Sequence, residues 1–341
     1  MLLPRPAYFR VPVRFALLRR PGKMRKPVRI EGIDAFRYLL SFLVVLLHSL
    51  PSPSTLAGAE WPFWFAILCR GAVPFFFIAS GYFMRPGTGW QTILKPAMRL
   101  IPIYLFWRVI YAAVAMARRE PPIWQSWTDL IRGSEAFHLW FLPALGIALA
   151  VVSFGIGRFG YRITGAVCCA LMVCGLAVGI YHDIVGPPVG PLRGGILTAP
   201  FMVFIGALLA KYDFRIGRGA ALACVAGALL LVAIEESMIA AATGTPRISH
   251  DFSLPTFALG AALLLVARDL PDRAIWTGLA RLGAISLTVY TSHLLFINLL
   301  APMLDKSQPL PCLAVSACAF VMATLTGLTL RRVPWLRPIA R

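Results

Sequence analysis

The chain has 341 residues, of which 59% are hydrophobic and only 14% are charged. Soluble domains usually carry about 25% charged and 45–50% apolar residues, so this composition excludes an ordinary cytosolic enzyme, a secreted disulfide scaffold and a disordered regulator. The 33 Lys and Arg residues outnumber the 14 Asp and Glu residues, which gives a formal net charge of +19. The sequence therefore predicts a polytopic membrane protein with an unusually basic surface.

Long apolar runs are expected to cross the membrane as helices, because a span of the hydrocarbon layer needs about 20 apolar residues. A helix satisfies its own backbone hydrogen bonds in lipid, and the runs lack the alternation of barrel strands. We therefore predict an all-α, polytopic transmembrane bundle of about ten spans. These are Ile33–Leu50, Trp61–Met84, Leu100–Ala117, Leu139–Gly155, Thr164–Tyr181, Gly194–Ala210, Ala220–Ala241, Leu254–Val266, Ala284–Ala301 and Leu310–Leu330.

The basic residues lie mainly on one side of these predicted spans. The two ends of the chain and alternate connections hold 24 of them, whereas the other connections hold six. By the positive-inside rule, both termini are predicted to be cytoplasmic. The excess charge then faces anionic lipid headgroups, and no nucleic-acid partner is expected, because no connection is long enough for a nucleic-acid-binding fold. We expect a basic cytoplasmic tail at residues 1–29, a membrane domain at 30–335 and a short cytoplasmic end at 336–341.

The first predicted span carries two ionisable residues, Arg37 and His48. They are eleven residues apart, so a helix places them on one face, about 16 Å apart along the axis. Ionisable groups inside a span usually mark a functional site facing the bundle interior. The alternatives are that Arg37 extends to the cytoplasmic headgroups and that His48 is an interfacial histidine.

The second predicted span ends in a segment that contains Pro74 and Ser80-Gly81-Tyr82. Proline and glycine interrupt or bend helices, and the small Ser80-Gly81 pair permits the close approach of a partner helix or a ligand. We expect the bend at Pro74 and Gly81.

A cluster of basic residues follows this span. Arg85, Lys95 and Arg99 lie in the predicted cytoplasmic connection, and with Arg37 they are expected to form a cationic mouth. Such a mouth suits phosphate groups. The alternative is that these charges only orient the chain, which is the favoured reading for Lys95 taken alone.

Two further polar groups lie in later spans. His138 and Trp140 stand on the outer side of the fourth span, where Trp140 alone is typical of an aromatic belt. In the ninth span, Ser286, Tyr290 and His293 share one helix face, as either a site or a hydrogen-bonded packing seam. The seven cysteines form no C-x-x-C pair, and no metal site is expected.

Together these segments resemble the acyltransferase-3 family of integral-membrane enzymes. The resemblance lies in the order and spacing of five segments, which are Gly32–Arg37 followed by Val44–His48, Phe75–Tyr82, Arg99–Pro102, His138–Leu142 and Ile285–His293. In many members a Glu follows the segment that matches His138–Leu142, whereas Pro143 stands here. This departure is more similar to the branch of the O-acetyltransferase of enterobacterial common antigen, and it places any role for a carboxylate there in doubt.

The resemblance implies an acyltransferase of the bacterial cytoplasmic (inner) membrane. It implies acyl-coenzyme A, expected to be acetyl-CoA, as the donor substrate, a cell-surface or exported glycan as the acceptor, membrane lipids as neighbours, and no bound cofactor. His48 is expected to act as general base or as covalent acyl carrier. The remaining roles fall to Arg37, Arg85, Arg99, Ser80 and Tyr82 on the donor side, and to His138, Trp140, Tyr290 and His293 on the acceptor side. The alternative function is a transporter of an anionic solute or lipid-linked glycan, which polar stripes suit equally.

Overall fold

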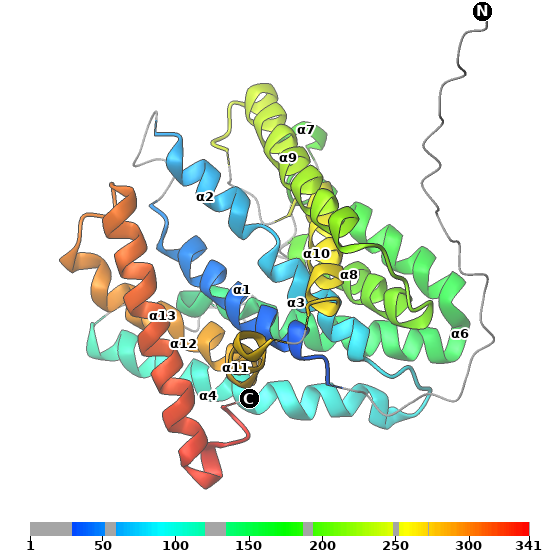
Figure 1. Cartoon of the computed structure of the whole chain (residues 1–341), viewed down its shortest axis with the longest axis horizontal. Helices are drawn as coiled ribbons and strands as arrows, with labels where there is room; N and C mark the ends of the chain where they lie inside the picture. The colour runs from blue at the N-terminus through cyan, green and yellow to red at the C-terminus, as the bar shows by residue number, and fades with distance from the viewer. Residues whose placement is uncertain are drawn as a thin grey trace, which may run out of the picture.

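The computed structural model describes residues 29–51, 59–119, 134–186, 194–247, 252–271 and 273–340. All regular secondary structure in these ranges is helical, which confirms the predicted all-α class (Figure 1). The helices are α1 Glu31–Ser49, α2 Trp61–Cys69, α3 Ala72–Phe83, α4 Trp90–Ala117, η2 Ser134–Trp140, α6 Phe141–Ala177, α7 His182–Val185, α8 Gly194–Lys211, α9 Arg218–Thr243, α10 Leu254–Arg268, α11 Ala274–Gly283, α12 Ser286–Leu300, η3 Ala301–Met303, α13 Pro309–Arg332 and η4 Pro334–Leu336. The predicted basic tail lies outside the described residues, apart from Arg29.

Seven helical segments in the described part of the chain are long and apolar enough to cross a membrane. Two shorter apolar helices, α8 and α10, accompany them. These features confirm a helical, multi-pass membrane protein. The count of ten spans and the cytoplasmic position of both termini stay predictions.

Helix α6 contains two of the predicted spans and changes direction at Gly160. The backbone there has a φ of +77°, which glycine adopts without steric strain. A Cβ atom on Gly155 would lie 2.9 Å from the Thr164 side chain. Nine residues of straight helix would separate these positions by about 13.5 Å along the axis. The chain therefore turns back at Gly160 and packs against itself.

The second predicted span is divided into α2 and α3, but the break lies at Arg70-Gly71 rather than at Pro74 and Gly81. The proline explains the displacement, because its ring clashes with the carbonyl group four residues earlier, which here belongs to Arg70. Gly81 lies inside regular helix and serves close packing instead. A Cβ atom on Gly81 would lie 1.9 Å from the carbonyl oxygen of Val203 on α8.

Helix α4 begins at Trp90, ten residues before the expected start of the third span at Leu100. Lys95 and Arg99 are therefore helical residues and do not belong to a connection. Lys95 and Arg99 are exposed residues of this helix, and together with Trp90 they line a cavity described below. A search for continuous apolar runs ends at such charged residues. Helix α11, which contains Arg281, was not predicted for the same reason.

Helix α1 occupies the middle of the bundle and contacts α3, α10, α11, α12 and α13 (Figure 1). The largest core cluster joins side chains of α1, α3, α4, α6, α8 and α12. Any group that projects from α1 therefore meets side chains from several other helices. This position explains how one helix contributes to two polar sites at its opposite ends.

Candidate active site

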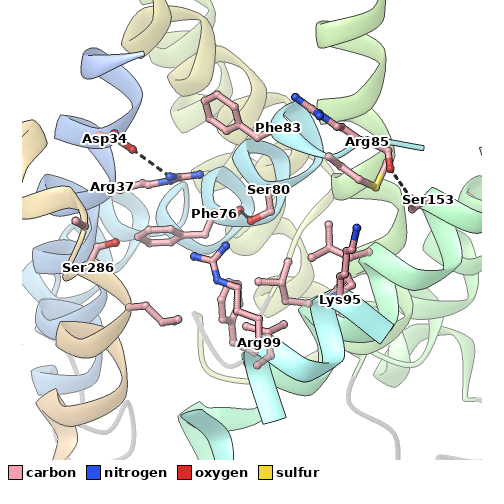
Figure 2. A pocket seen from close by; sticks show the side chains of 18 of the residues that line it. Asp34, Arg37, Phe76, Ser80, Phe83, Arg85, Lys95, Arg99, Ser153 and Ser286 are labelled. Carbon is pink, nitrogen blue, oxygen red and sulfur yellow. Dashed lines mark hydrogen bonds and ion pairs between the residues drawn. The ribbon is translucent and has the colours of Figure 1, made fainter. Parts of the chain in front are cut away.

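A large cavity of about 1590 Å³ opens between α1, α3, α4, α6 and α12, with the end of α13 at its edge. Figure 2 shows Arg37, Ser80, Lys95 and Arg99 around it. Helix α3 contributes one regular stripe at three- and four-residue spacing, consisting of Val73, Phe76, Ser80 and Phe83. Helix α6 contributes a stripe at every fourth residue, consisting of Phe141, Leu145, Leu149 and Ser153.

Positive charge dominates one end of this cavity, which we call the cationic mouth. Seven basic side chains and one acid line the cavity among the described residues. The acid, Asp34, accepts hydrogen bonds from Arg29 at 2.7 Å and from Arg37 at 3.1 Å. The Arg37 guanidinium also lies 5.3 Å from the centre of the Phe83 ring. The basic residues are Arg29, Arg37, Arg85, Lys95, Arg99, Arg331 and Arg337.

The surplus of positive charge cannot be neutralised by Asp34 alone, because one carboxylate faces seven cations. Arginine presents planar, multiple donors that match phosphate oxygens, and lysine adds a point charge. The mouth is thus suited to a ligand with several phosphate groups. Its volume exceeds the 300–1,000 Å³ of common small-molecule pockets, so it has room for a large ligand.

The other end of the cavity is apolar and aromatic. Phe76, Leu100, Phe141 and Tyr290 line it. On α6 the stripe runs from Phe141 at this inner end to Ser153 at the mouth, where the Ser153 hydroxyl donates to the Arg85 carbonyl oxygen (Figure 2). A ligand in the cavity therefore meets charge at one end and apolar side chains at the other.

Three histidines meet beyond this apolar end, and we call them the histidine cluster. His48 comes from α1, His138 from η2 and His293 from α12. The ring centroids of His48 and His293 are 5.0 Å apart, as are those of His138 and His293. His138 and His293 are fully buried, whereas His48 is partly exposed. No group of three or more His, Cys, Asp or Glu side chains within the described ranges is arranged to hold a metal ion.

The hydrogen bonds fix the proton positions on two of these rings. His293 Nδ1 faces the Tyr290 carbonyl oxygen at 2.5 Å, so Nδ1 donates and Nε2 carries the lone pair. His48 Nδ1 faces both the Val44 carbonyl oxygen at 2.9 Å and His293 Nε2 at 3.1 Å. Because both partners are acceptors, His48 Nδ1 carries the proton. The basic nitrogen of neutral His48 is therefore Nε2.

His138 is held by a separate set of bonds. Its Nε2 atom lies 3.3 Å from the Thr291 carbonyl oxygen, to which it donates, and 3.4 Å from the Tyr111 hydroxyl oxygen. Tyr111 also donates to the Thr291 carbonyl oxygen at 3.0 Å, and the Tyr290 hydroxyl donates to the His138 carbonyl oxygen. These bonds tie η2, α4 and α12 together, so the backbone around the cluster is firmly positioned.

Comparison with known proteins identifies the family. The model of an acyltransferase domain of the acyltransferase-3 family matches residues 30–331, most of the chain. The chain belongs to the acyltransferase-3 family. The resemblance carried by the sequence segments is thereby confirmed, and residues 30–331 form an acyltransferase domain of a multi-pass membrane type.

This chain also has relatives that are named as racemases. It is 24% identical over 332 residues to a protein of Enterococcus faecalis named amino-acid racemase, a match that covers 87% of this chain and 46% of the relative. It is 22% identical over 204 residues to a serine/alanine racemase of Enterococcus gallinarum, covering 53% of this chain and 29% of the relative. The chain thus spans less than half the length of these relatives. No solved structure is found to match the acyltransferase.

The structure brings most of the predicted site residues together, in two neighbouring groups. Arg37, Ser80, Arg85 and Arg99 line the cavity, whereas His48, His138 and His293 form the histidine cluster. Tyr290 belongs to both, because its ring lines the cavity and contacts the cluster.

Two predicted site residues lie elsewhere in the acyltransferase. Tyr82 is absent from the cavity lining, because two helical residues turn it about 200° away from Ser80, and its backbone packs against Gly206 of α8. Trp140 is buried and packs its ring against Phe77 and Phe252. Its burial removes it from the lipid interface, where an aromatic belt residue would lie.

Sequence reasoning missed several lining residues of the acyltransferase. Arg29, Arg331 and Arg337 belong to the basic residues that orient the chain, and all three also line the cavity. Tyr111 does not line the cavity but contacts His138 of the histidine cluster, and its place among apolar residues of α4 hides it in the sequence. One signal was available for it: Tyr104 and Tyr111 share a face of that helix, and a tyrosine hydroxyl in a span requires a hydrogen-bond partner.

Proposed function

We propose that this acyltransferase moves an acyl group, expected to be acetyl, from acyl-CoA to a hydroxyl of a cell-surface or exported glycan in the bacterial cytoplasmic membrane. The observation that carries the proposal is the cationic mouth, in which seven basic side chains face a single acid. Acyl-CoA bears its phosphate groups at one end and a thioester on a flexible arm at the other. The mouth suits the phosphates, and the apolar inner end suits the arm.

The arm has a defined distance to bridge. Arg37 and His48 lie on the same helix α1, eleven residues apart, which corresponds to about 16 Å of rise. A donor whose phosphates contact Arg37 must therefore extend its arm toward the histidine cluster. The cavity continues in that direction as far as Phe141 and Tyr290.

The proposed chemistry uses His48 as general base. Its Nε2 atom takes the proton of the acceptor hydroxyl while the oxygen attacks the thioester carbonyl. The carbon–sulfur bond then breaks, the acyl–oxygen ester bond forms, and the CoA thiolate leaves and is protonated. In the alternative, His48 Nε2 attacks the thioester carbonyl and expels the CoA thiolate, and in a second step the acceptor hydroxyl takes the acyl group from Nε2 and loses its proton.

The test is transfer of radiolabel from acetyl-CoA to an envelope glycan by the purified protein. His48→Ala is expected to lower the rate by about 10²–10⁴-fold, the usual contribution of a general base. The matched control is His182→Ala, because His182 lies on α7, remote from the cavity lining, and pairs with Asp183. Full transfer by His48→Ala would remove His48 from the chemistry. Movement of label across vesicles without incorporation into glycan would instead favour the transport alternative.

A further inference from the structure

Two aromatic rings form a wall at the inner end of the cavity. Phe141 of α6 and Tyr290 of α12 line the cavity there, and their ring centroids are 5.1 Å apart. The exposed fractions of Phe141 and Tyr290 are 5% and 6%. Phe76 supports the same wall from α3, 6.3 Å from the Phe141 centroid.

This wall stands between the cavity and the histidine cluster. Tyr290 precedes His293 by three residues of α helix, a rise of about 4.5 Å, and Phe141 follows His138 by three residues at the end of the 3-10 helix η2, a rise of about 6 Å. The Tyr290 ring centroid is 5.7 Å from that of His138 and 6.0 Å from that of His293. None of the three cluster histidines lines the cavity. A thioester that approaches the cluster from the mouth therefore arrives at these rings.

We propose that Phe141 and Tyr290 set the length and charge of the acyl group, so that the enzyme selects a short, uncharged acyl-CoA. The inference rests on the proposed function. In a donor whose phosphates occupy the mouth, the acyl chain is the part that lies beyond the thioester. It therefore points at the inner end of the cavity, where the two rings lie. An acetyl group adds one methyl there, whereas a longer chain meets the two rings.

Contacts behind both rings oppose their displacement by a long chain. On its far side Phe141 packs 4.6 Å from the Phe77 ring, centroid to centroid. Tyr290 is anchored through its hydroxyl, which donates to the His138 carbonyl oxygen. Extra methylene groups in a well-packed interior force side chains and backbone to shift. One methylene changes selection in a hydrophobic pocket by about 10–200-fold.

Charge selection follows from the same geometry. The basic side chains that line the cavity lie at its mouth, while the inner end presents Phe76, Leu100, Phe141 and Tyr290. A succinyl group would bring a carboxylate against these apolar side chains. Burying an ion without a partner is strongly unfavourable. Succinyl-CoA is therefore expected to be a poorer donor than acetyl-CoA, although it binds through the same phosphates.

The experiment compares acetyl-, butyryl-, hexanoyl- and succinyl-CoA as donors for the purified protein and for Phe141→Ala. The native protein is expected to prefer acetyl-CoA over hexanoyl-CoA by at least about tenfold. Phe141→Ala is expected to raise the ratio of hexanoyl to acetyl transfer by at least about tenfold, because it opens the wall. The matched control is Phe257→Ala, an equally buried phenylalanine on α10 outside the cavity, which is expected to keep the native ratio.

A second variant and a binding assay cover the case in which Phe141→Ala does not fold. Phe141→Leu removes part of the ring and is expected to shift the ratio in the same direction, and competition with labelled acetyl-CoA reports donor binding without turnover. Equal use of hexanoyl- and acetyl-CoA by the native protein would overturn the inference, as would an unchanged ratio in both variants. A native protein that binds none of the acyl-CoA donors would instead overturn the proposed function itself.

Discussion

The hydrogen bond between His48 and His293 predicts that His293 positions the general base without taking part in the chemistry. His48 Nδ1–H has two acceptors, the Val44 carbonyl oxygen at 2.9 Å and His293 Nε2 at 3.1 Å. His293→Leu removes the second acceptor and leaves the first. A single hydrogen bond contributes about 0.5–1.5 kcal/mol, so kcat is expected to fall by up to about tenfold. This loss is far smaller than the one expected for His48→Ala.

The assay measures kcat and KM for acetyl-CoA in three variants, with thermal unfolding as a check because His293 is fully buried. His293→Gln offers an amide oxygen near the former Nε2 position and is expected to recover most of kcat. The KM for acetyl-CoA is expected to stay constant, since His293 does not line the cavity. A loss in His293→Leu as large as that in His48→Ala would refute the reasoning, because His293 would then act in the chemistry itself. Identical kcat values for His293→Leu, His293→Gln and the native protein would refute it as well.

The remaining predictions concern donor binding and helix packing. Arg37→Ala is expected to weaken acyl-CoA binding about tenfold or more, as for a lost hydrogen bond to a charged group, while Arg218→Ala, outside the cavity lining, keeps the native affinity in equilibrium dialysis. Gly81→Ala would place its Cβ 1.9 Å from the Val203 carbonyl oxygen, so the free energy of unfolding is expected to fall by about 1–3 kcal/mol. Gly219→Ala meets open space on α9 and should match or exceed native stability in thermal unfolding. Native donor affinity in Arg37→Ala, or equal melting temperatures for the two glycine variants, would contradict these expectations.

Periodicity and composition predicted the parts of the site that lie on single helices. Helix geometry predicts that Arg37 and His48, eleven residues apart, share one face of α1. It likewise places Ser286, Tyr290 and His293 on one face of α12, and Arg37, Ser286 and Tyr290 line the cavity. Each of these predictions concerns residues close together in the sequence, where the helix repeat fixes their relation.

Contacts between distant helices could not be predicted in this way. His48 and His293 are separated by 245 residues, and no periodic pattern states which helices will be neighbours. The sequence also could not separate binding charges from orientation charges. Arg331 and Arg337 line the cavity, but they have the same sign as the many basic residues that orient the chain. The break at Arg70 was displaced from the predicted position because proline acts on the carbonyl group four residues before it.

The cavity draws its cations from both ends of the described chain, which has a consequence for biosynthesis. Arg29 precedes the first helix, whereas Arg331 and Arg337 lie at and beyond the end of the last. During translation, the lining residues of the earlier helices therefore enter the membrane before Arg331 and Arg337 are available to complete the cationic mouth. The complete pocket can form only after α13 has been inserted, so a chain truncated before α13 would lack part of the mouth.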